Sequence, residues 1–187
     1  MWLVVGLGNA DEAYVETRHN IGFMVIDSLA YKLSIQLKQK TKNFKYARGF
    51  IEDKEVILIK PLTFMNRSGI AVREANKKFE GICKILVVHD DLDLEAGTIR
   101  IRKAGSSGGH RGVESVIENL GSRDFVRLKI GIGRSDKVSP EEYVLKSFNN
   151  KEKPVIAEAI EKAAEAIFVL VSEGVSQAQN KFHSSSK

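Results

Sequence analysis

The stretch that says most about the fold is residues 84–112, KILVVHDDLDLEAGTIRIRKAGSSGGHRG. Its apolar run Ile85–Val88 is short and rich in β-branched residues, which is typical of a strand buried on both faces. The run ends at three carboxylates, Asp90, Asp91 and Asp93. Ligands of open α/β sheets bind beyond the carboxyl ends of the strands, so we expect the functional site here. His89 and Asp90 are neighbours on a strand and point to opposite faces, so a histidine that serves Asp90 must come from elsewhere.

On either side of this stretch, short segments typical of strands alternate with segments whose apolar residues recur at helical spacing. Further strands are predicted at Trp2–Leu7, Phe44–Phe50, Glu55–Lys60, Thr98–Lys103 and Phe125–Ile132, and helices after Asn20, up to about Phe79, over about His110–Leu120, from Pro154 and from Val175. This order predicts an α/β fold, a mixed β-sheet sandwiched between helices, in a single domain over residues 1–187. The tail is expected to fray from about residue 183, which places His183 outside any site.

Composition indicates a globular protein in a reducing compartment. Of 187 residues, 43% are hydrophobic and 28% are charged, which is ordinary for a globular domain. No apolar run is long enough to span a bilayer, and the start, MWLVVGLGN, lacks the basic segment of a signal peptide. The single cysteine, Cys83, excludes an internal disulfide framework. Because Cys83 directly precedes the core strand, we expect a buried thiol and not a nucleophile.

The positive charge of the chain is unevenly distributed. The net charge is +5, and the sequence pI is about 9.2. Basic residues flank and follow the central stretch: Arg100, Arg102, Lys103, Arg111, Arg123, Arg127, Lys129 and Arg134. Such clustering favours a polyanionic partner, with a solvated basic surface as the alternative.

Several sequence motifs for other chemistries match only in part. Gly6-Leu7-Gly8-Asn9 begins like a dinucleotide-binding loop, but Asp11 stands where the third glycine belongs. Residues 105–109, GSSGG, match the GxSxG of a serine hydrolase, yet after Gly112 the only histidine is His183, in the tail. A calcium loop from Asp91 fails in its spacing, and no GK[ST] closes a P-loop. We therefore expect no metal and no cofactor.

The remaining candidates suit general base catalysis. His19 lies in a loop after the first strand, Asp90 ends a strand, and asparagines and glycines occupy the loops. A histidine can take a proton from water, a carboxylate can fix its tautomer, and amides can hold a carbonyl. An exposed loop histidine remains the alternative for His19.

Four segments together resemble bacterial peptidyl-tRNA hydrolase: GLGNADEAYVETRHNIG, KPLTFMNRSG, VVHDDLDLEAGTIRIRKAGSSGGHRG and RLKIGIGR. The resemblance covers nearly the whole chain in the right order. It implies a metal-free, cytoplasmic, usually monomeric enzyme that hydrolyses the ester between a peptide and the 3′ end of tRNA.

The resemblance also implies roles for individual residues. His19 matches the catalytic base, Asp90 its supporting carboxylate, and Asn9 the amide that favours N-blocked substrates. Asn66 matches a peptide-binding amide, and the substrate site is completed by Tyr14, Phe64, Met65 and Arg111. Arg102 and Lys129 fall at positions that hold tRNA phosphates, and we expect Arg100, Lys103 and Arg127 to join them. His89 is then a packed strand residue and His110 a residue near the site.

Three positions depart from the family pattern. Ala10-Asp11 replaces Pro-Gly, Arg111 replaces the asparagine of GGHNG, and Ser135 follows GIGR where proline is usual. Arginine can donate hydrogen bonds but cannot accept them. The change at Arg111 keeps open an alternative, a non-catalytic tRNA- or RNA-binding protein on the same fold, similar to splicing factors. The retained set of His19, Asp90, Asn9 and Asn66 favours the hydrolase.

Overall fold

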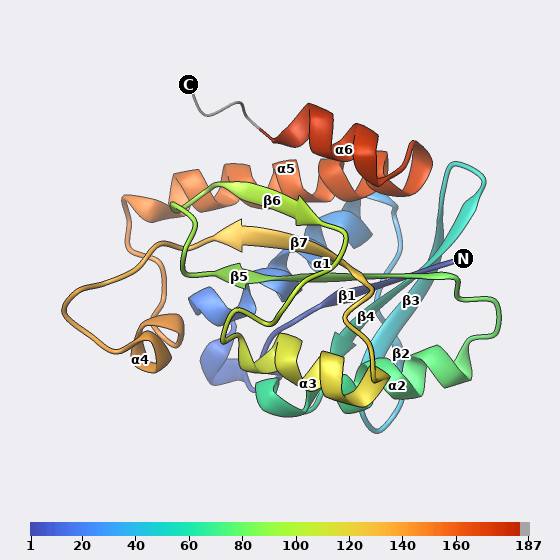
Figure 1. Ribbon diagram of the computed structural model, residues 1–187, viewed down its shortest axis with the longest axis horizontal. Coiled ribbons are helices and arrows are strands. Elements are labelled where there is room, and N and C mark those ends of the chain that lie inside the picture. The colour runs from blue at the N-terminus through green and yellow to red at the C-terminus, as the bar shows by residue number, and fades with distance from the viewer. Residues whose placement is uncertain (184–187) are drawn as a thin grey trace.

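A seven-stranded mixed sheet forms the centre of the computed structural model, which describes residues 1–183 (Figure 1). Its spatial order is β2-β3-β4-β1-β5-β7-β6. The strands are β1 (Trp2–Gly6), β2 (Gln39–Lys40), β3 (Phe44–Ile51), β4 (Lys54–Pro61), β5 (Lys84–Asp91), β6 (Ile99–Arg102) and β7 (Val126–Gly131). The parallel pairs are β1 with β4, β1 with β5, and β5 with β7, whereas the outer strands pair antiparallel.

The central strands β1 and β5 end side by side. Their register pairs Gly6 with Val88, and the backbone N–H of Leu7 donates to the carbonyl of Val88 over 2.9 Å. Both strands are buried on both faces, as their continuous apolar sequences predict. The loop after β1 and the carboxylates at the end of β5 therefore meet at one edge of the sheet.

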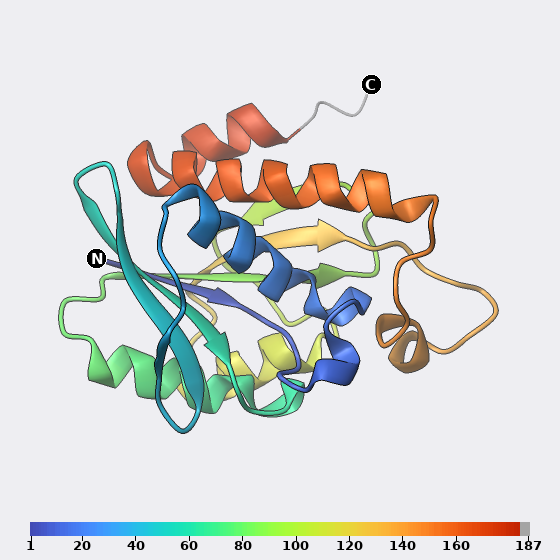
Figure 2. The same ribbon diagram turned by 180° about the vertical axis from the view of Figure 1, so that it is seen from behind.

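Helices cover the two faces of the sheet unequally. The α-helices are α1 (Ile21–Lys32), α2 (Ser68–Lys78), α3 (Arg111–Leu120), α4 (Pro140–Val144), α5 (Glu152–Ser172) and α6 (Val175–Phe182). Short 3-10 turns are η1 (Glu12–Tyr14), η2 (Arg18–Asn20) and η3 (Met65–Arg67). One buried cluster joins α1 and α5 to the sheet face seen in Figure 2, and a second joins α2 and α3 to the opposite face.

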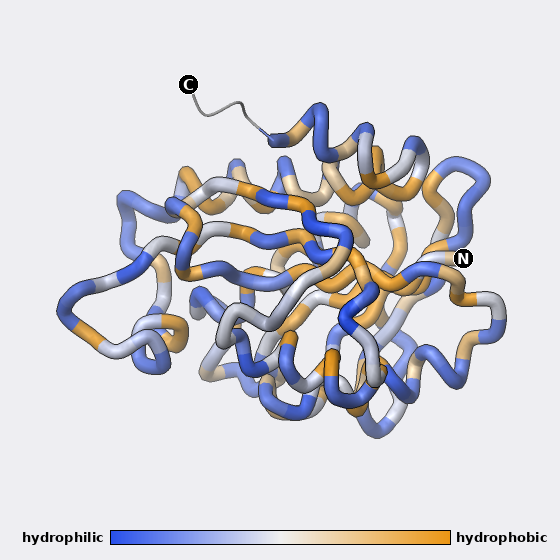
Figure 3. The backbone as a smooth tube through the Cα atoms, viewed as in Figure 1, coloured by the Kyte–Doolittle hydropathy of each residue, from blue (hydrophilic) through white to orange (hydrophobic). Residues whose placement is uncertain are grey.

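The strands β6 and β7 are amphipathic. Hydrophobic and hydrophilic residues alternate along them (Figure 3). Ile99 and Ile101 of β6 belong to the cluster that contains α5, so Arg100 and Arg102 point to the other face. The α2–α3 layer lies below these two strands in Figure 1, which leaves this part of the face without a helix.

The helix α1 packs unusually close to the ends of β1 and β5 because of Gly22. A Cβ atom at Gly22 would lie 2.5 Å from the backbone atoms of Leu7 and of Val88. Any side chain there would push the helix away from the sheet. Gly22 therefore fixes the approach of the residues just before α1, among them His19.

The helix α6 covers the edge strand β6. The N–H of Ile101 donates to His183 Nε2 over 2.8 Å, and the carbonyl of Ile101 accepts from Gln179 Nε2 over 3.0 Å. Burial, together with the positive charges of Arg100 and Arg102, lowers the pKa of His183. The expectation of a tail frayed from about residue 183 is wrong for His183 itself, because this hydrogen bond places it. Residues 184–187 lie outside the described part of the chain.

The expected fold class is confirmed, and two details differ. Cys83 is exposed and donates through Sγ to the carbonyl of Met1 over 3.3 Å, so the prediction of a buried thiol is wrong. The long helix begins at Glu152, two residues before Pro154, because Asn149 Oδ1 accepts from the N–H groups of Lys151 and Glu152. Proline is tolerated in the first turn of a helix. Within residues 1–183, no helix is both long and apolar enough to cross a membrane.

Candidate active site

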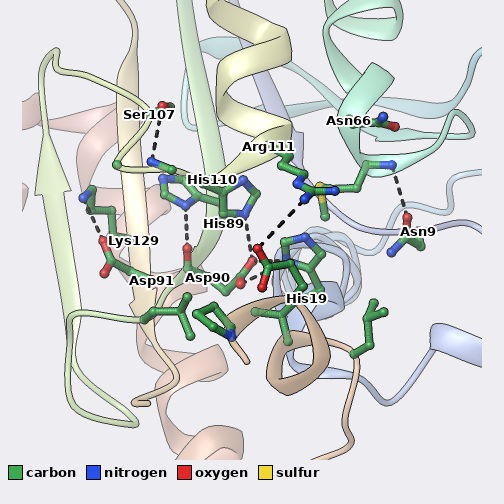
Figure 4. A pocket seen from close by; sticks show the side chains of 18 of the residues that line it. Asn9, His19, Asn66, His89, Asp90, Asp91, Ser107, His110, Arg111 and Lys129 are labelled. Atoms are coloured by element: carbon green, nitrogen blue, oxygen red, sulfur yellow. Dashed lines mark hydrogen bonds and ion pairs between the residues drawn. The ribbon is translucent and has the colours of Figure 1, made fainter. Parts of the chain in front are cut away.

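A pocket of about 700 Å³ opens where β1 and β5 end (Figure 4). Its walls include the loop after β1, the η3 turn, the end of β5, the loop before α3 and the short helix α4. The residues expected at the active site gather here, since the pocket is lined by Asn9, Tyr14, His19, Phe64, Met65, Asn66, Asp90 and Arg111. The pocket thus lies at the edge of the sheet where the sequence predicts the functional site.

His19 and Asp90 form a directly bonded pair. The Nδ1 atom of His19 lies 2.9 Å from Asp90 Oδ1 and 3.0 Å from Oδ2. Asp90 is 2% exposed; burial alone would raise its pKa, but the two histidines that bond to its carboxylate, His110 and His19, outweigh burial and lower the pKa far below its ordinary range. The ionised carboxylate can only accept, so His19 carries its proton on Nδ1. In the neutral ring, Nε2 of His19 is then the nitrogen that can accept a proton.

A second histidine, His110, also bonds to Asp90. Its Nε2 lies 2.9 Å from Asp90 Oδ1. Its Nδ1 accepts from the N–H groups of Gly112 and Val113, over 3.1 and 3.2 Å, and so caps the N-terminus of α3. A nitrogen that accepts two N–H groups carries no proton, so the proton of His110 is on Nε2 and points at Asp90. These hydrogen bonds form a continuous series from the start of α3 through His110 and Asp90 to His19, and each acceptor in the series faces a donor.

His19, Asp90 and His110 also have the composition of a metal site. Their ligand atoms all lie within 4.8 Å of one another. However, His110 could ligate through Nε2 only if its proton moved to Nδ1, where it would meet two backbone donors. The hydrogen-bond network thus favours a proton over a metal ion at this position.

Asn9 is held at two points, so that its amide group has a fixed orientation. The backbone N–H of Asn9 donates to Asn20 Oδ1 over 2.8 Å, and Asn20 Nδ2 donates back to the Asn9 carbonyl over 2.9 Å. Asn9 Oδ1 accepts from the backbone N–H of Met65 over 3.1 Å. The Nδ2 group of Asn9 is the donor left for a ligand. Asn20 directly precedes α1, where a polar side chain often caps the helix, yet its side chain makes no capping bond and bonds to Asn9 instead.

The expected substrate-binding residues differ widely in exposure. Phe64 is 75% exposed at the pocket rim, whereas Met65 is 6% exposed beneath it. Tyr14 is half-buried and Asn66 is exposed. Within the described residues, the side chain of Asn66 has no hydrogen-bond partner in the protein. Its donor and acceptor therefore remain available at the pocket.

Arg111 extends across the pocket from the first position of α3 (Figure 4). Its guanidinium lies 3.9 Å from the carboxylate of Glu141 on α4, and both side chains are about two-thirds exposed. An exposed pair at this distance contributes little to stability. The other pocket cations are paired more closely: Lys129 Nζ lies 2.7 Å from Asp91 Oδ2, and Arg134 pairs with Asp93.

The five cations expected to bind phosphate do not share one surface. Arg100, Arg102 and Lys129 point to the sheet face that lacks a helix, where Arg100 pairs with Lys129 in the register. The prediction that Arg127 binds phosphate is wrong, because Arg127 is 1% exposed and donates to the carbonyls of Arg123, Phe125 and Gly105. Lys103 is exposed, and its Nζ extends toward α6, where it lies 3.3 Å from Ser176 Oγ, so its phosphate contact stays a prediction.

The other candidate chemistry is not supported by the geometry. The Ser107 hydroxyl of the GxSxG match accepts from the N–H of Gly109 over 3.4 Å and, within residues 1–183, bonds to no histidine. His89 is a packed strand residue, as expected, and is 2% exposed. Its Nδ1 donates to the carbonyl of Asp90 over 2.7 Å, and its ring centroid lies 4.8 Å from that of His110. Burial lowers the pKa of His89 well below its ordinary value.

Sequence reasoning missed two parts of the site. The helix α4 forms a pocket wall through Pro140, Glu141, Val144 and Leu145. Ser139 followed by Pro140 is a helix-start signal that could have revealed it, since Ser139 Oγ accepts from the N–H of Glu142. The bond from His110 to Asp90 joins residues that are far apart in the chain, and no local pattern indicates it.

Comparisons with known proteins agree with this geometry. The sequence model of the family described as peptidyl-tRNA hydrolase matches residues 3–187. The peptidyl-tRNA hydrolases of Thermodesulfovibrio yellowstonii and Bacillus subtilis are 44% and 43% identical to this chain; the first match covers 98% of this chain and 99% of the relative, and the second covers 98% of each. A crystal structure of peptidyl-tRNA hydrolase from Acinetobacter baumannii is similar with a TM-score of 0.91 and 37% identity, over 98% of this chain and 95% of that one. The chain belongs to the peptidyl-tRNA hydrolase family.

Proposed function

We propose that this protein hydrolyses the ester bond of peptidyl-tRNA and of other N-blocked aminoacyl-tRNAs, releasing the peptide and free tRNA. The observation that carries this proposal is the His19–Asp90 pair, 2.9 Å apart at the base of a pocket lined by amide groups. Full-length similarity to enzymes named for this activity supports it.

His19 acts as the general base. Its Nε2 takes a proton from a water molecule as the water oxygen attacks the ester carbonyl, and returns it to the ribose oxygen that leaves. Asp90 holds the Nδ1–H tautomer and stabilises the imidazolium, because its carboxylate stays ionised. A positioned base of this kind contributes about 10²–10⁴-fold to the rate.

The amides at the pocket explain a preference for N-blocked substrates. A blocked amino group is an amide whose carbonyl can accept from Asn9 Nδ2 or from Asn66. A free aminoacyl ester presents an ammonium group instead, which would set donor against donor. Sites built to pair with one polar group discriminate strongly against a substrate that leaves it unpaired.

The cations on the open sheet face suit the phosphates of the tRNA. Lys129 lines the pocket, and Arg100, its neighbour in the register, and Arg102 lie on the same sheet face outside the pocket lining. Contacts to phosphate position the nucleic acid without reading its bases, and salt weakens them steeply. Lys129 would have to share its charge between a phosphate and Asp91. We further propose that the protein acts as a monomer in the cytoplasm without a metal or another cofactor.

The decisive experiment measures release of N-acetyl-aminoacyl groups from tRNA in EDTA, with unblocked aminoacyl-tRNA as the control substrate. We expect fast cleavage of the blocked substrate only. His19→Ala should abolish cleavage and leave tRNA affinity nearly unchanged, because its ring contacts Asp90 and not the open sheet face. Equal loss of cleavage and affinity would mean that His19 is structural. Tight tRNA binding without cleavage, restored by Arg111→Asn, would mean an RNA-binding protein on a hydrolase frame.

A further inference from the structure

We propose that Arg18 is a positioning residue that joins the turn carrying His19 to the α4 wall of the pocket. The inference rests on the proposed function, because it assigns Arg18 a role in that same reaction. Arg18 immediately precedes the base in the η2 turn, yet its side chain points away from Asp90 into the segment that follows α4.

The guanidinium of Arg18 is almost completely occupied. Its Nη1 donates to the carbonyls of Lys146 and Ser147 over 3.0 and 2.6 Å. Its Nη2 meets both oxygens of Glu152, over 2.9 and 2.7 Å. The side chain is only 6% exposed. These contacts lie more than 120 residues away in the sequence, so the residue ties together two distant parts of the chain.

Aromatic rings enclose the same group from α4 and its following loop. The guanidinium carbon lies 4.3 Å from the ring centroid of Tyr143 and 5.1 Å from that of Phe148. A planar guanidinium can stack on an aromatic face, whereas an ammonium group supplies the charge without a plane to stack. Lysine could replace the charge of Arg18 but neither its fork nor its stacking.

The backbone repeats this connection. The N–H of Arg18 donates to the Lys146 carbonyl over 3.1 Å, and Thr17 forms an isolated β-bridge with Ser147. Tyr143, whose ring stacks on Arg18, also donates from its hydroxyl to the carbonyl of Ile132 over 2.9 Å, one residue after β7 ends. The C-terminal end of α4 is thus held both to the end of β7 and to the His19 turn.

This arrangement links substrate contact to the base. A peptide in the pocket rests on α4, where Glu141, Val144 and Leu145 line the wall. Arg18, directly before His19 in the chain, anchors that wall, while the His19 ring bonds to Asp90. Loosening Arg18 would therefore let the wall and the base move relative to each other. Misplacement of reacting groups by about 1 Å can cost about 10²-fold in rate.

Stability alone does not explain the cluster. Buried ion pairs often stabilise folded proteins no better than apolar side chains of similar volume, and within residues 1–183 the buried Nε atom of Arg18 has no hydrogen-bond partner. What the cluster provides is a defined geometry between two segments that carry opposite sides of the pocket.

The test compares Arg18→Lys and Glu152→Gln with the matched control Arg48→Lys. Arg48 also pairs with a glutamate, Glu55, at 2.8 Å and lies 5.6 Å from the ring of Phe79, but it is far from the pocket in the β3–β4 hairpin. The measurements are kcat and KM on N-acetyl-aminoacyl-tRNA, tRNA affinity, and backbone hydrogen exchange over residues 139–148.

We expect Arg18→Lys to lower kcat by about 10- to 100-fold, with tRNA affinity within twofold of the wild type. Exchange over residues 139–148 should accelerate, while exchange in β1 and β5 stays unchanged. Glu152→Gln should show the same pattern with a smaller loss of kcat. If Arg18→Lys fails to fold, the result for Glu152→Gln tests the inference in its place. Arg48→Lys should change neither kcat nor this exchange.

A folded Arg18→Lys with kcat within twofold of the wild type would overturn the inference, as would a loss that merely follows the folded fraction. A wild-type protein that cleaves no ester would contradict the proposed function and this inference with it. A fully active Arg18→Lys beside an active wild type would contradict the inference alone.

Discussion

Replacement of His110 separates two roles that one ring combines. Its Nδ1 caps α3 through the N–H groups of Gly112 and Val113, and its Nε2 donates to Asp90. His110→Ala removes both contacts. His110→Asn removes the donor to Asp90 but supplies a side-chain oxygen of the kind preferred at helix N-caps. Both variants lose the ring, so the difference between them isolates the cap.

The contacts set the expected size of each effect. Loss of an N-cap costs about 1 kcal/mol of unfolding free energy, and loss of a hydrogen bond to a charged group costs about 1.5–3 kcal/mol. His110→Ala should therefore lower the free energy of unfolding by about 2.5–4 kcal/mol, and His110→Asn by about 1.5–3 kcal/mol. Urea unfolding at neutral pH measures both values.

Activity should follow the bond to Asp90 and not the cap. Both variants leave Asp90 with His19 as its only histidine partner, so its carboxylate is held less firmly. If at least 1.4 kcal/mol of that bond is felt in the transition state, kcat falls by about tenfold or more in both variants. Recovery of kcat in His110→Asn would refute this reasoning, because the cap and not the Nε2 proton would then support catalysis. Equal stability of the two variants would refute the capping role.

Three further predictions concern residues of the strands β5, β6 and β7. Arg127→Lys should lower the free energy of unfolding by about 2–3 kcal/mol in urea titrations, because three carbonyls lose donors; a changed salt dependence of tRNA binding would contradict its structural role. Arg102→Ala should raise KM more than it lowers kcat and should reduce the log–log salt slope of tRNA binding by about 0.7–0.9; a collapse of kcat alone would argue against a phosphate contact. The folded-state pKa of His89 is depressed, so the unfolded state binds more protons and wild-type stability should fall as pH drops below about 6.5. Urea unfolding at pH 5 and 7.5 should show a smaller fall in His89→Asn, and an unchanged fall would exclude His89 as its source.

The parts of the site that the sequence predicts correctly depend on local rules. The apolar run Ile85–Val88 ends at Asp90, and strand alternation alone shows that His89 cannot be its partner. The rule that ligands bind at the carboxyl ends of strands then points to the sheet edge where Asp90 lies. These local rules do not select His19; its assignment as the partner of Asp90 rests on the resemblance to the family.

The errors arise where tertiary contacts decide. Arg127 and Lys129 alternate correctly onto one face of β7, but only the fold reveals that the Gly105 loop covers Arg127 and leaves Lys129 beside the pocket. A polar residue just before a helix predicts a cap, and His110 is one. Asn20 occupies the same kind of position, yet it bonds to Asn9 because the loop after β1 passes beside it.

The two edges of the sheet are protected in different ways. The strand β2 has only two residues, both polar and exposed, and so offers little template for another strand. The strand β6 is longer, but Gln179 and His183 occupy the carbonyl and the N–H of Ile101. The helix α6 therefore shields β6 from intermolecular strand addition. A chain that ends before Val175 would expose these groups, and its first defect would be self-association through β6 while the pocket stayed intact.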